Sequence, residues 1–337
     1  MKPGPNNSIT DVPGIAVGNA EDAAVRSGVT VVLPDQPAVA SVDVRGGGTG
    51  TRELALLEPE GAVEHIHALT LAGGSAFGLD AASGVMSWLA AQGRGFTVGA
   101  AVVPIVPAAI LFDLNNGGDK SAFSEASGDD LPYRTLGRMA AKGAGTDFAL
   151  GNAGAGLGAT AGPLKGGLGS ASFVLDDGVF VGALAAVNAA GSAVMPGSDR
   201  FWAWPFERNG EFGGKGPPDR LPDDLRYDFA NPRMARPGTN TTLAVVATDL
   251  SLTKTQARRV AIMAQNGLAR ALRPVHTPLD GDIVFTLSTG MRELENPVAD
   301  LARLGTAAAD CLARAVARGV YEAQSLGDMR SYRDVFG

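Results

Sequence analysis

Residues 241–248 read TTLAVVAT, a run of β-branched and small apolar residues that predicts a buried strand. A capping-box pair, Thr253 and Gln256, follows it, and apolar residues then recur every three or four positions, as on one face of a helix. A second strand, DIVFTL, is expected at 282–287, and a last amphipathic helix over 301–319. This alternation of strands and helices predicts a layered α/β domain in which helices cover sheets.

The preceding part of the chain carries the same kinds of element. Strands are expected at 28–33 and 68–72, and an amphipathic helix is expected to end near Gly93. Two further strands, 171–175 and 179–187, are joined by an Asp-Asp-Gly turn, which predicts a hairpin. The chain shows no internal repeat, and its 337 residues fit a single domain spanning 1–337.

Glycine is unusually frequent, at 46 of 337 residues, but it lacks the three-residue period of collagen. Many glycines lie beside strand-like runs, which predicts tight turns and close packing of backbones. Residues 189–240 differ in texture, because they are rich in proline, glycine and charge. We expect a long, flexible connection there, of the kind that is uncommon inside a compact domain unless it has a function.

The charge and cysteine content exclude several classes of protein. Lys and Arg number 28 against 35 Asp and Glu, so the net charge is −7 and nucleic acid is a poor candidate partner. The one cysteine, Cys311, cannot form an intrachain disulfide or a cysteine-rich zinc site. Residues 1–18 lack the apolar stretch of a signal peptide, and no run is long enough to span a membrane. We expect a soluble cytoplasmic protein.

Familiar cofactor and nucleophile motifs are incomplete. The sequence GGSAF at 73–77 lacks the final glycine of a nucleophile elbow. A dinucleotide-binding loop directly follows a strand, but the sequence GAGLGA at 154–159 follows no clear strand. His65 and His67 could share a metal, but no third ligand is near them, so they are expected to be two surface histidines. No cofactor and no metal are therefore expected.

Two parts of the sequence, around Thr241 and around Asp280 to Asp282, could together form a catalytic site. Asp280 and Asp282 flank Gly281 at the mouth of a strand, and side chains two apart share one face. Two adjacent carboxylates resist full ionisation unless a cation or a hydroxyl donor lies between them. Thr241, at the start of the other strand, could be that donor. If the chain were cut before it, its new α-amine could act as base for its own hydroxyl. An ordinary strand threonine and a polar turn remain alternative interpretations.

With these residues in view, the whole chain resembles the self-cleaving L-aminopeptidase/D-esterase family of peptidases, family S58. It is most similar to the branch with a threonine nucleophile, the nylon-oligomer (6-aminohexanoate-oligomer) hydrolases. The order of NTTLAVVATD and VHTPLDGD, about 40 residues apart, is its most specific mark. The other motifs that carry the resemblance are ITDVPGIAVG, VDVRGGGTG, LAGGSAFGLDAASGV, VPIVPAAILFDL, GNAGAGLGATAG and LAAVNAAG.

The resemblance implies a cut between Asn240 and Thr241, which leaves a large chain 1–240 and a small chain 241–337 that stay together. It implies that Thr241 is the nucleophile and that Asp280 and Asp282 orient and help to activate it. The peptidase branch has serine and a Ser-x-Glu pair at these places, so the threonine and the Asp-x-Asp pair favour the nylon-hydrolase-like branch.

Three further positions take their meaning from the resemblance. Asn188 matches the asparagine that donates to the oxyanion, and Lys165 matches a lysine near the nucleophile. For Asn188 a strand-end turn, and for Lys165 a solvated loop lysine, remain alternatives. Phe112 stands where some relatives carry a tyrosine, so any role of that hydroxyl is missing here.

The implied fold is an αββα sandwich of the N-terminal-nucleophile-hydrolase type, assembled as a homotetramer of cleaved heterodimers. The expected function is cofactor-free hydrolysis of small linear amides or peptides through a threonine acyl-enzyme. An acyltransferase of the ornithine acetyltransferase type and a non-enzymatic, glycine-rich assembly protein are the alternatives. The sequence leaves open whether the substrate is a peptide, a β-peptide, a D-amino-acid amide or a nylon-type oligomer.

Overall fold

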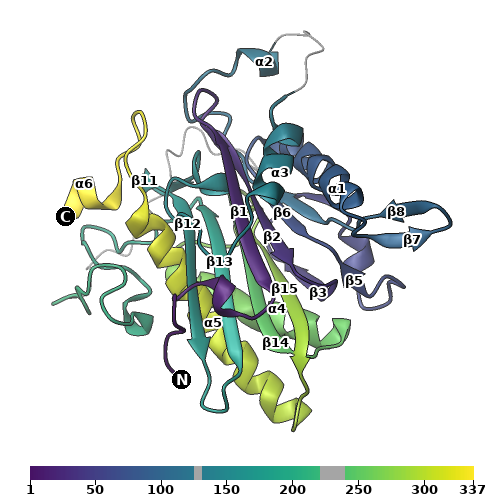
Figure 1. Ribbon diagram of the computed structural model, residues 1–337. Coiled ribbons are helices and arrows are strands. Elements are labelled where there is room, and N and C mark those ends of the chain that lie inside the picture. Colours follow the sequence, from purple (N-terminus) through teal and green to yellow (C-terminus); the bar gives the residue numbers. More distant parts are fainter. Residues whose placement is uncertain (125–130, 221–239) are drawn as a thin grey trace.

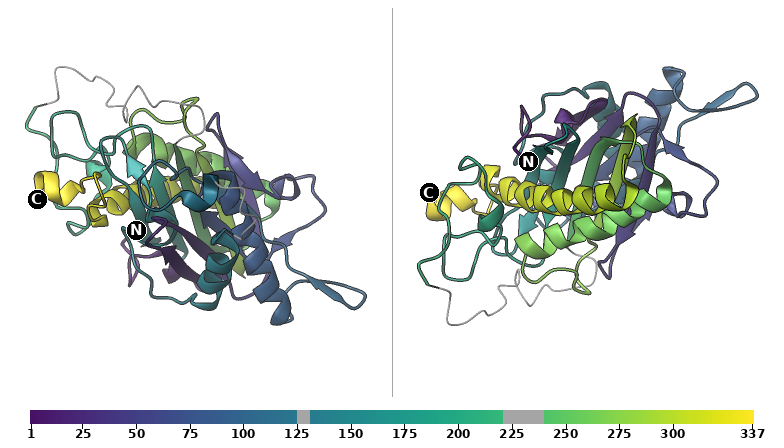
Figure 2. Two further views of the ribbon diagram at one scale, coloured as in Figure 1. Left: turned by 90° about the horizontal axis from the view of Figure 1, so that it is seen from above. Right: turned by 90° about the horizontal axis from the view of Figure 1, so that it is seen from below.

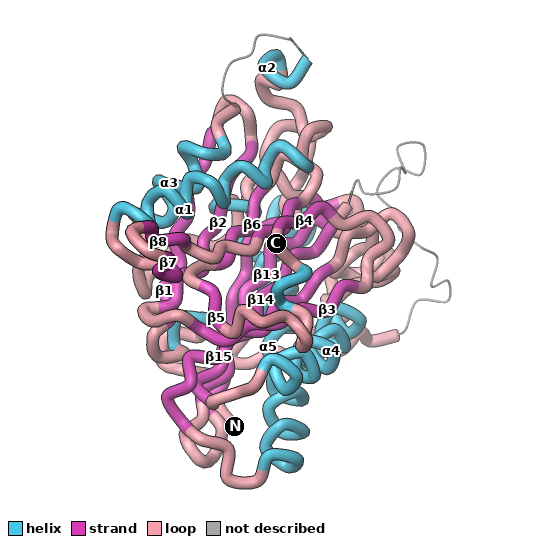
Figure 3. Tube along the Cα trace, turned by 90° about the vertical axis from the view of Figure 1, so that its right-hand side faces the viewer, coloured by secondary structure: helices cyan, strands magenta, loops and turns pink. Residues whose placement is uncertain are grey.

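The computed structural model describes residues 1–124, 131–220 and 240–337 of the chain. In it two β-sheets lie face to face, and a pair of helices covers the outer face of each (Figure 1, Figure 2). Figure 3 shows the strands gathered between the two helix pairs. This arrangement confirms the layered α/β domain predicted from the sequence and the αββα sandwich that the resemblance implied.

The larger sheet contains the strand predicted at 241–248. Its six strands lie in the order β12-β13-β14-β15-β3-β5. Strand β14 pairs antiparallel with β13 and parallel with β15, so it is central and has a partner on both sides. The strands are β3 (Ala38–Val44), β5 (His65–Ile66), β12 (Gly167–Val174), β13 (Phe180–Asn188), β14 (Thr241–Leu250) and β15 (Ile283–Arg292).

The second sheet is built from the first third of the chain. Its order is β1-β2-β6-β9-β4, with β6 and β9 parallel and the other pairs antiparallel. The strands are β1 (Ile15–Asp22), β2 (Ser27–Pro34), β4 (Gly50–Arg52), β6 (Leu69–Ala72) and β9 (Ala108–Ile110).

Two helix pairs form the outer layers. Helices α4 (Lys254–Ala271) and α5 (Pro297–Glu322) pack on the larger sheet, and α1 (Ala81–Ala91) and α3 (Tyr133–Lys142) pack on the smaller one. The capping box predicted for α4 is present, with Thr253 and Gln256 each bound to the other's backbone. None of the helices in the described ranges carries a stretch long and apolar enough to cross a membrane.

Three apolar cores lie between these layers, and β14 shows why the middle of its sequence, Leu243 to Ala247, is continuously apolar. Leu243 and Val245 face the core between the sheets, whereas Ala244 and Val246 face the core under α4 and α5. A strand covered on both faces needs apolar residues at every position, not at alternate ones. All ten residues of β14 are buried accordingly.

Smaller elements complete the chain. A hairpin of β7 and β8 projects from the body, with Phe96 62% exposed (Figure 1). The short elements are β7 (Phe96–Val98), β8 (Ala101–Val103), β10 (Thr160–Ala161), β11 (Leu164–Lys165), α2 (Ser121–Ser124), α6 (Tyr332–Phe336) and the 3₁₀ turns η1 (Ile9–Asp11), η2 (Ala55–Leu57), η3 (Ser75–Asp80), η4 (Gly154–Gly156) and η5 (Trp204–Phe206).

The flexible connection predicted for 189–240 falls partly outside the described residues, since 221–239 are not among them. Residues 189–220 have little regular secondary structure, but they are packed rather than loose. Phe201 and Phe212 are 3% and 2% exposed and meet edge to face, with ring centroids 5.3 Å apart. Aromatic side chains between the polar residues anchor this part of the segment against the core under α5.

Candidate active site

The predicted site residues gather at one end of the larger sheet. Asn188 ends β13 and lies opposite Thr241, the first residue of β14. Asp282 immediately precedes β15, whose first residue, Ile283, is in register with Leu243 of β14. Three neighbouring strands therefore bring an amide, a hydroxyl and a carboxylate to the same sheet end. The side chains of all five predicted catalytic residues are at most 2% exposed, and these residues are Lys165, Asn188, Thr241, Asp280 and Asp282.

The peptide bond before Thr241 has its carbonyl oxygen held by two donors. The Oγ1 hydroxyl of Thr241 donates to the carbonyl of Asn240 at 2.5 Å. The main-chain N–H of Gly281 donates to the same oxygen at 2.8 Å. A hydroxyl beside the carbonyl, together with an N–H that polarises it, is the arrangement that attack of the hydroxyl on that carbonyl needs.

The acidic pair binds the backbone of two neighbouring segments, β14 and the chain that follows β13. Asp282 accepts from the N–H of Thr242 at 2.8 Å through Oδ1. Asp280 accepts from the N–H of Ala190 at 3.0 Å through its Oδ1. The two carboxylates thus fix the start of β14 and the chain just after β13, through the main chain instead of through the threonine hydroxyl.

The second oxygen of each carboxylate is bound by one of two consecutive residues, His276 for Asp282 and Thr277 for Asp280. Oδ2 of Asp282 accepts from the N–H of His276 at 3.0 Å and lies 2.9 Å from its Nδ1. Oδ2 of Asp280 accepts from the N–H of Thr277 at 3.0 Å and from its hydroxyl at 2.6 Å. Burial raises the pKa of Asp280, and the charge of Asp282 raises it further, while the bonds from Thr277 and Ala190 oppose the rise.

Asn188 connects the site to two loops. Its Nδ2 donates to the carbonyl of Phe112 at 3.0 Å, and its Oδ1 accepts from the N–H of Thr160 at 2.9 Å. The backbone of Phe112 is therefore a direct neighbour of the asparagine. The amide N–H₂ has two donors, so an oxyanion could bind Asn188 in addition to the Phe112 carbonyl or in its place.

Lys165 is buried, which rules out the solvated loop lysine considered from the sequence. Its Nζ donates to the carbonyls of Gly156 and Gly166 at 3.0 and 2.7 Å. Burial lowers the pKa of Lys165 to about 7, and the charge of Asp113 opposes the shift only in part. A lysine with this pKa exists near neutral pH as a mixture of amine and ammonium.

A glycine turn that the sequence analysis had not connected to the site supports the acidic loop. The N–H groups of Arg45 and Gly46 donate to the carbonyl of Asp282 at 3.0 and 3.1 Å, and that of Gly48 donates to the carbonyl of Asp280 at 2.9 Å. A Cβ at Gly46 would lie 2.2 Å from the Asp282 nitrogen. Only glycine lets these two loops approach so closely.

His276, Thr277 and this turn are the parts of the site that the analysis of single residues missed. The motifs VDVRGGGTG and VHTPLDGD contain them. The signal that could have found them is the closeness in sequence of His276 and Thr277 to the acidic pair.

His65 and His67 are not two surface histidines, because His67 is 7% exposed. Its Nδ1 accepts from the N–H of Ile105 at 3.1 Å, so its ring serves the packing of a loop. Within the described part of the chain, no three His, Cys, Asp or Glu side chains lie close enough together to hold a metal.

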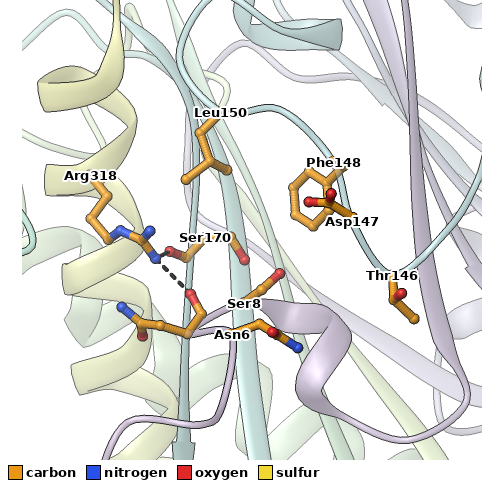
Figure 4. A pocket seen from close by; sticks show the side chains of 9 residues that line it. Asn6, Ser8, Thr146, Asp147, Phe148, Leu150, Ser170 and Arg318 are labelled. Atoms are coloured by element: carbon orange, nitrogen blue, oxygen red, sulfur yellow. Dashed lines mark hydrogen bonds between the residues drawn. The ribbon is translucent and has the colours of Figure 1, made fainter.

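A polar pocket separate from the predicted site residues lies beside α5 (Figure 4). It has a volume of about 440 Å³ and lies between the N-terminal loop, residues 146–150, β12 and α5. Arg318 reaches its edge and donates to the carbonyl of Asn7 at 2.6 Å. None of the five predicted site residues lines it.

The chain is similar over almost its whole length to one peptidase family. The family model described as Peptidase family S58 matches residues 7–333. A protein named as an uncharacterized aminopeptidase in Mycobacterium tuberculosis is 46% identical over 348 residues, covering 98% of this chain and 98% of that protein. The 6-aminohexanoate-oligomer endohydrolase of Kocuria sp. is 30% identical over 288 residues, covering 83% of this chain and 74% of the enzyme.

Solved structures have the same fold at lower identity. The L-aminopeptidase D-Ala-esterase/amidase of Ochrobactrum anthropi, which has a variant of the N-terminal-nucleophile hydrolase fold, matches with a TM-score of 0.72 and 22% identity, covering 98% of this chain and 91% of that one. A Burkholderia sp. β-aminopeptidase matches with a TM-score of 0.69 and 23% identity, covering 97% and 89%.

Proposed function

The chain belongs to peptidase family S58, and from this premise we propose that it cuts itself between Asn240 and Thr241 and then uses Thr241 as the nucleophile of an amidohydrolase. Its family and relatives make it a hydrolase of peptide or other amide bonds. The identity of the nucleophile and the self-cleavage are the parts that we add.

The observation that carries the proposal is the pair of donors on the Asn240 carbonyl. In self-cleavage the Thr241 Oγ adds to the carbonyl carbon of Asn240, and the N–H of Gly281, 2.8 Å from the carbonyl oxygen, stabilises the negative charge that develops there. The C–N bond then breaks, and the hydroxyl proton ends on the nitrogen of Thr241. Water hydrolyses the resulting ester, which leaves a carboxylate on Asn240 and a free amine and hydroxyl on Thr241.

The mature site would work by the same chemistry on an external amide. The new α-amine of Thr241, with an ordinary pKa of about 7.7–8.0, takes the proton of its own Oγ as the hydroxyl attacks the substrate carbonyl. The leaving amine accepts a proton, and water releases the acid from the threonine ester. We assign Asn188 to the substrate oxyanion, since it lies directly opposite Thr241 in the sheet.

We assign small linear amides or peptides as the substrate class. Relatives named as aminopeptidases and as 6-aminohexanoate-oligomer endohydrolases support this choice. Lys165 is buried two residues before Gly167, which pairs with Val187 next to Asn188, and it would supply a cation or a neutral amine according to pH. Phe112, whose carbonyl accepts from Asn188, has no hydroxyl to offer to the substrate.

The intact mass of the purified protein tests the proposal. We expect two polypeptides, 1–240 and 241–337, with the smaller beginning at Thr241 by N-terminal sequencing. The Thr241→Ala variant should give one uncut chain without amidase activity, because no hydroxyl remains to attack. Thr241→Ser keeps a hydroxyl and is the matched control, and it should still be cut. A wild-type chain that stays whole and still hydrolyses amides would contradict the proposal.

The same preparation distinguishes a hydrolase from the alternative acyltransferase. Its product would form only when an acceptor amine such as ornithine is added, whereas a hydrolase releases the free acid in water alone.

A further inference from the structure

We propose that Asp113 is a positioning residue for Asn188: its buried carboxylate fixes the carbonyl of Phe112, against which the asparagine amide is oriented. This inference rests on the proposed function, because it takes Asn188 as the donor to the substrate oxyanion. It adds a residue that touches no substrate and acts through the asparagine.

Asp113 is a buried carboxylate that the proposed chemistry does not use. It is 2% exposed and lies three residues after the end of β9. Its Oδ1 accepts from the main-chain N–H of Gly74 at 2.7 Å. Burial raises the pKa of this carboxyl, while the Ser27 hydroxyl, the Gly74 N–H and the charge of Lys120 oppose the rise. Burying a carboxylate is unfavourable unless hydrogen bonds compensate it, so the bond from Gly74 is a strong and directional one.

Two glycine stretches that match no complete motif surround this carboxylate. They are GGSAF at 73–77 and GAGLGA at 154–159. A Cβ on Gly73 would lie 2.1 Å from the Oδ2 of Asp113, and a Cβ on Gly158 would lie 2.7 Å from the same oxygen. Only residues without a side chain can approach the carboxylate so closely. Both stretches therefore serve to enclose Asp113.

The carboxylate completes the attachment of its own segment to the first glycine stretch. Main-chain hydrogen bonds join Leu111 to Ala72 and to Ser75, at 2.9 and 3.0 Å. The side chain of Asp113 adds a further bond two residues later. The peptide group of Phe112 lies between these attachments. It is held from both ends, and the direction of its carbonyl is thereby fixed.

The Phe112 carbonyl in turn determines how the Asn188 amide lies. It accepts from Nδ2 of the asparagine at 3.0 Å, while the N–H of Thr160 donates to Oδ1 at 2.9 Å. With an acceptor at one end and a donor at the other, a flipped amide would lose both bonds. Because the amide is planar, the direction of its second N–H is then set as well. That second N–H is the one that the proposed function gives to the oxyanion.

Asp113 also interacts with Lys165, whose strand partner holds the other end of the Asn188 amide. Lys165 pairs with Thr160 in the hairpin of β10 and β11. Burial lowers the pKa of Lys165 to about 7, and the charge of Asp113 opposes the lowering. Above that pH the lysine is the neutral amine. A change at Asp113 studied at about pH 8.5 therefore acts on position and leaves the protonation of Lys165 unchanged.

The experiment is a double-mutant cycle on the cut enzyme. Asp113→Ala and Asn188→Ala are made singly and together, and Asp113→Asn keeps an oxygen for the Gly74 N–H. Tyr133→Phe is the matched control, because it removes a buried hydroxyl that lies 3.0 Å from Ser27 Oγ and feels the charge of the same carboxylate. Hydrolysis of alanine 4-nitroanilide is followed at about pH 8.5, where the α-amine of the nucleophile is also largely free base. Denaturing gels give the cut fraction, and urea midpoints give the stability.

We expect Asn188→Ala to lower kcat by on the order of a hundredfold, as for loss of one oxyanion donor. Asp113→Ala should lower it by on the order of tenfold, because the donor stays but is misplaced. The double variant should match Asn188→Ala within about twofold, since no amide is left to orient. Asp113→Asn should stay within about threefold of wild type. Tyr133→Phe should lower the urea midpoint and leave kcat unchanged.

Self-cleavage separates positioning from damage to the fold. All these variants should still be cut, because the N–H of Gly281, and not Asn188, binds the Asn240 carbonyl. An Asp113→Ala chain that stays uncut would overturn the inference, and so would one with wild-type kcat. Effects of the two alanine variants that multiply in the double variant would also overturn it, since the residues would then act independently. None of these results touches the proposed function, which fails if Thr241→Ala keeps the amidase activity.

A second measurement needs neither activity nor self-cleavage. In the uncut Thr241→Ala chain made with isotope-labelled asparagine, the side-chain NMR signal of Asn188 is identified by its loss in Asn188→Ala. Asp113→Ala should shift this signal, because the carbonyl that accepts its proton is displaced. Tyr133→Phe and Asp113→Asn should leave it in place. An Asn188 signal that Asp113→Ala does not move would overturn the inference.

Discussion

Gly281 joins the two carboxylates of the acidic pair and carries the N–H that binds the Asn240 carbonyl. A Cβ built on it would lie 2.6 Å from the Oγ1 of Thr241 and 2.7 Å from the carbonyl oxygen of Gly48. The absence of a side chain at this residue therefore leaves room for the hydroxyl on one side and the glycine turn on the other.

We expect Gly281→Ala to slow self-cleavage by on the order of a hundredfold, since displacing reacting groups by about 1 Å has an effect of that size. The uncut fraction after timed synthesis measures it. Gly145→Ala is the matched control, because a Cβ there would have no atom within 4 Å. A Gly281→Ala chain that cuts as fast as the control would show that the hydroxyl does not need this space.

At the same scale, the sequence predicted a set of candidate site residues but not what their side chains touch. Thr241, Asp280, Asp282 and Asn188 were found from strand boundaries and from motifs, and the structure brings them to one sheet end. The bonds of the acidic pair to His276 and to the main chain depend on how a turn folds back. The periodicity of apolar residues predicts helices and strands but does not predict such a turn.

At the scale of elements, glycine also decides how the helices pack. In the crossing of α1 and α3, a Cβ on Gly84 would lie 1.9 Å from the carbonyl oxygen of Arg134. A Cβ on Gly137 would lie 2.1 Å from the carbonyl oxygen of Ala81. Each helix therefore touches the backbone of the other through a glycine, which confirms the close backbone packing predicted from composition.

Gly137→Ala should force these helices apart and lower the free energy of unfolding by roughly 1–3 kcal/mol, the usual effect of overpacking. The urea midpoint measures the loss, with Gly145→Ala again as control. Self-cleavage should persist under native conditions, because α1 and α3 cover the sheet that does not carry Thr241. Equal midpoints for the two variants would contradict the tight crossing.

Most elements were predictable because their sequences are strongly periodic or apolar, as for β14 and α4. Apart from the hairpin of β12 and β13, the pairing of strands was not predictable. Strand β3 lies between β15 and β5, although some 240 residues separate it from β15 in the chain. Contacts so distant in sequence follow from packing of the whole sheet, and local patterns do not encode them.

At the scale of the whole molecule, the proposed cut falls at the start of a central strand. After it, β13 would belong to chain 1–240 and β14 with β15 to chain 241–337. Strand β14 pairs with β13 from Thr241 to Thr248, and β15 pairs with β3 along six residue pairs from Ile283 to Ser288. Both edges of the small chain's strand pair are thus hydrogen-bonded to the large chain.

The two cut chains should therefore co-elute from a size-exclusion column under native conditions and separate only in denaturant. They should also unfold in a single transition, because the cores on both faces of the sheet contain residues of both chains. Elution of a separate small chain from folded protein would contradict this. The same elution volume tests the homotetramer, which stays a prediction.

The burial of all five site residues has a consequence for how activity would begin. With Thr241 at 2% exposure, the uncut chain would shield its proposed nucleophile from outside molecules. The proposed nucleophile would then react first with the backbone that it already contacts, the Asn240 carbonyl, so maturation would be a first-order process. The fraction matured would then depend on elapsed time and solution conditions, and neither dilution nor the abundance of the protein would advance or delay it.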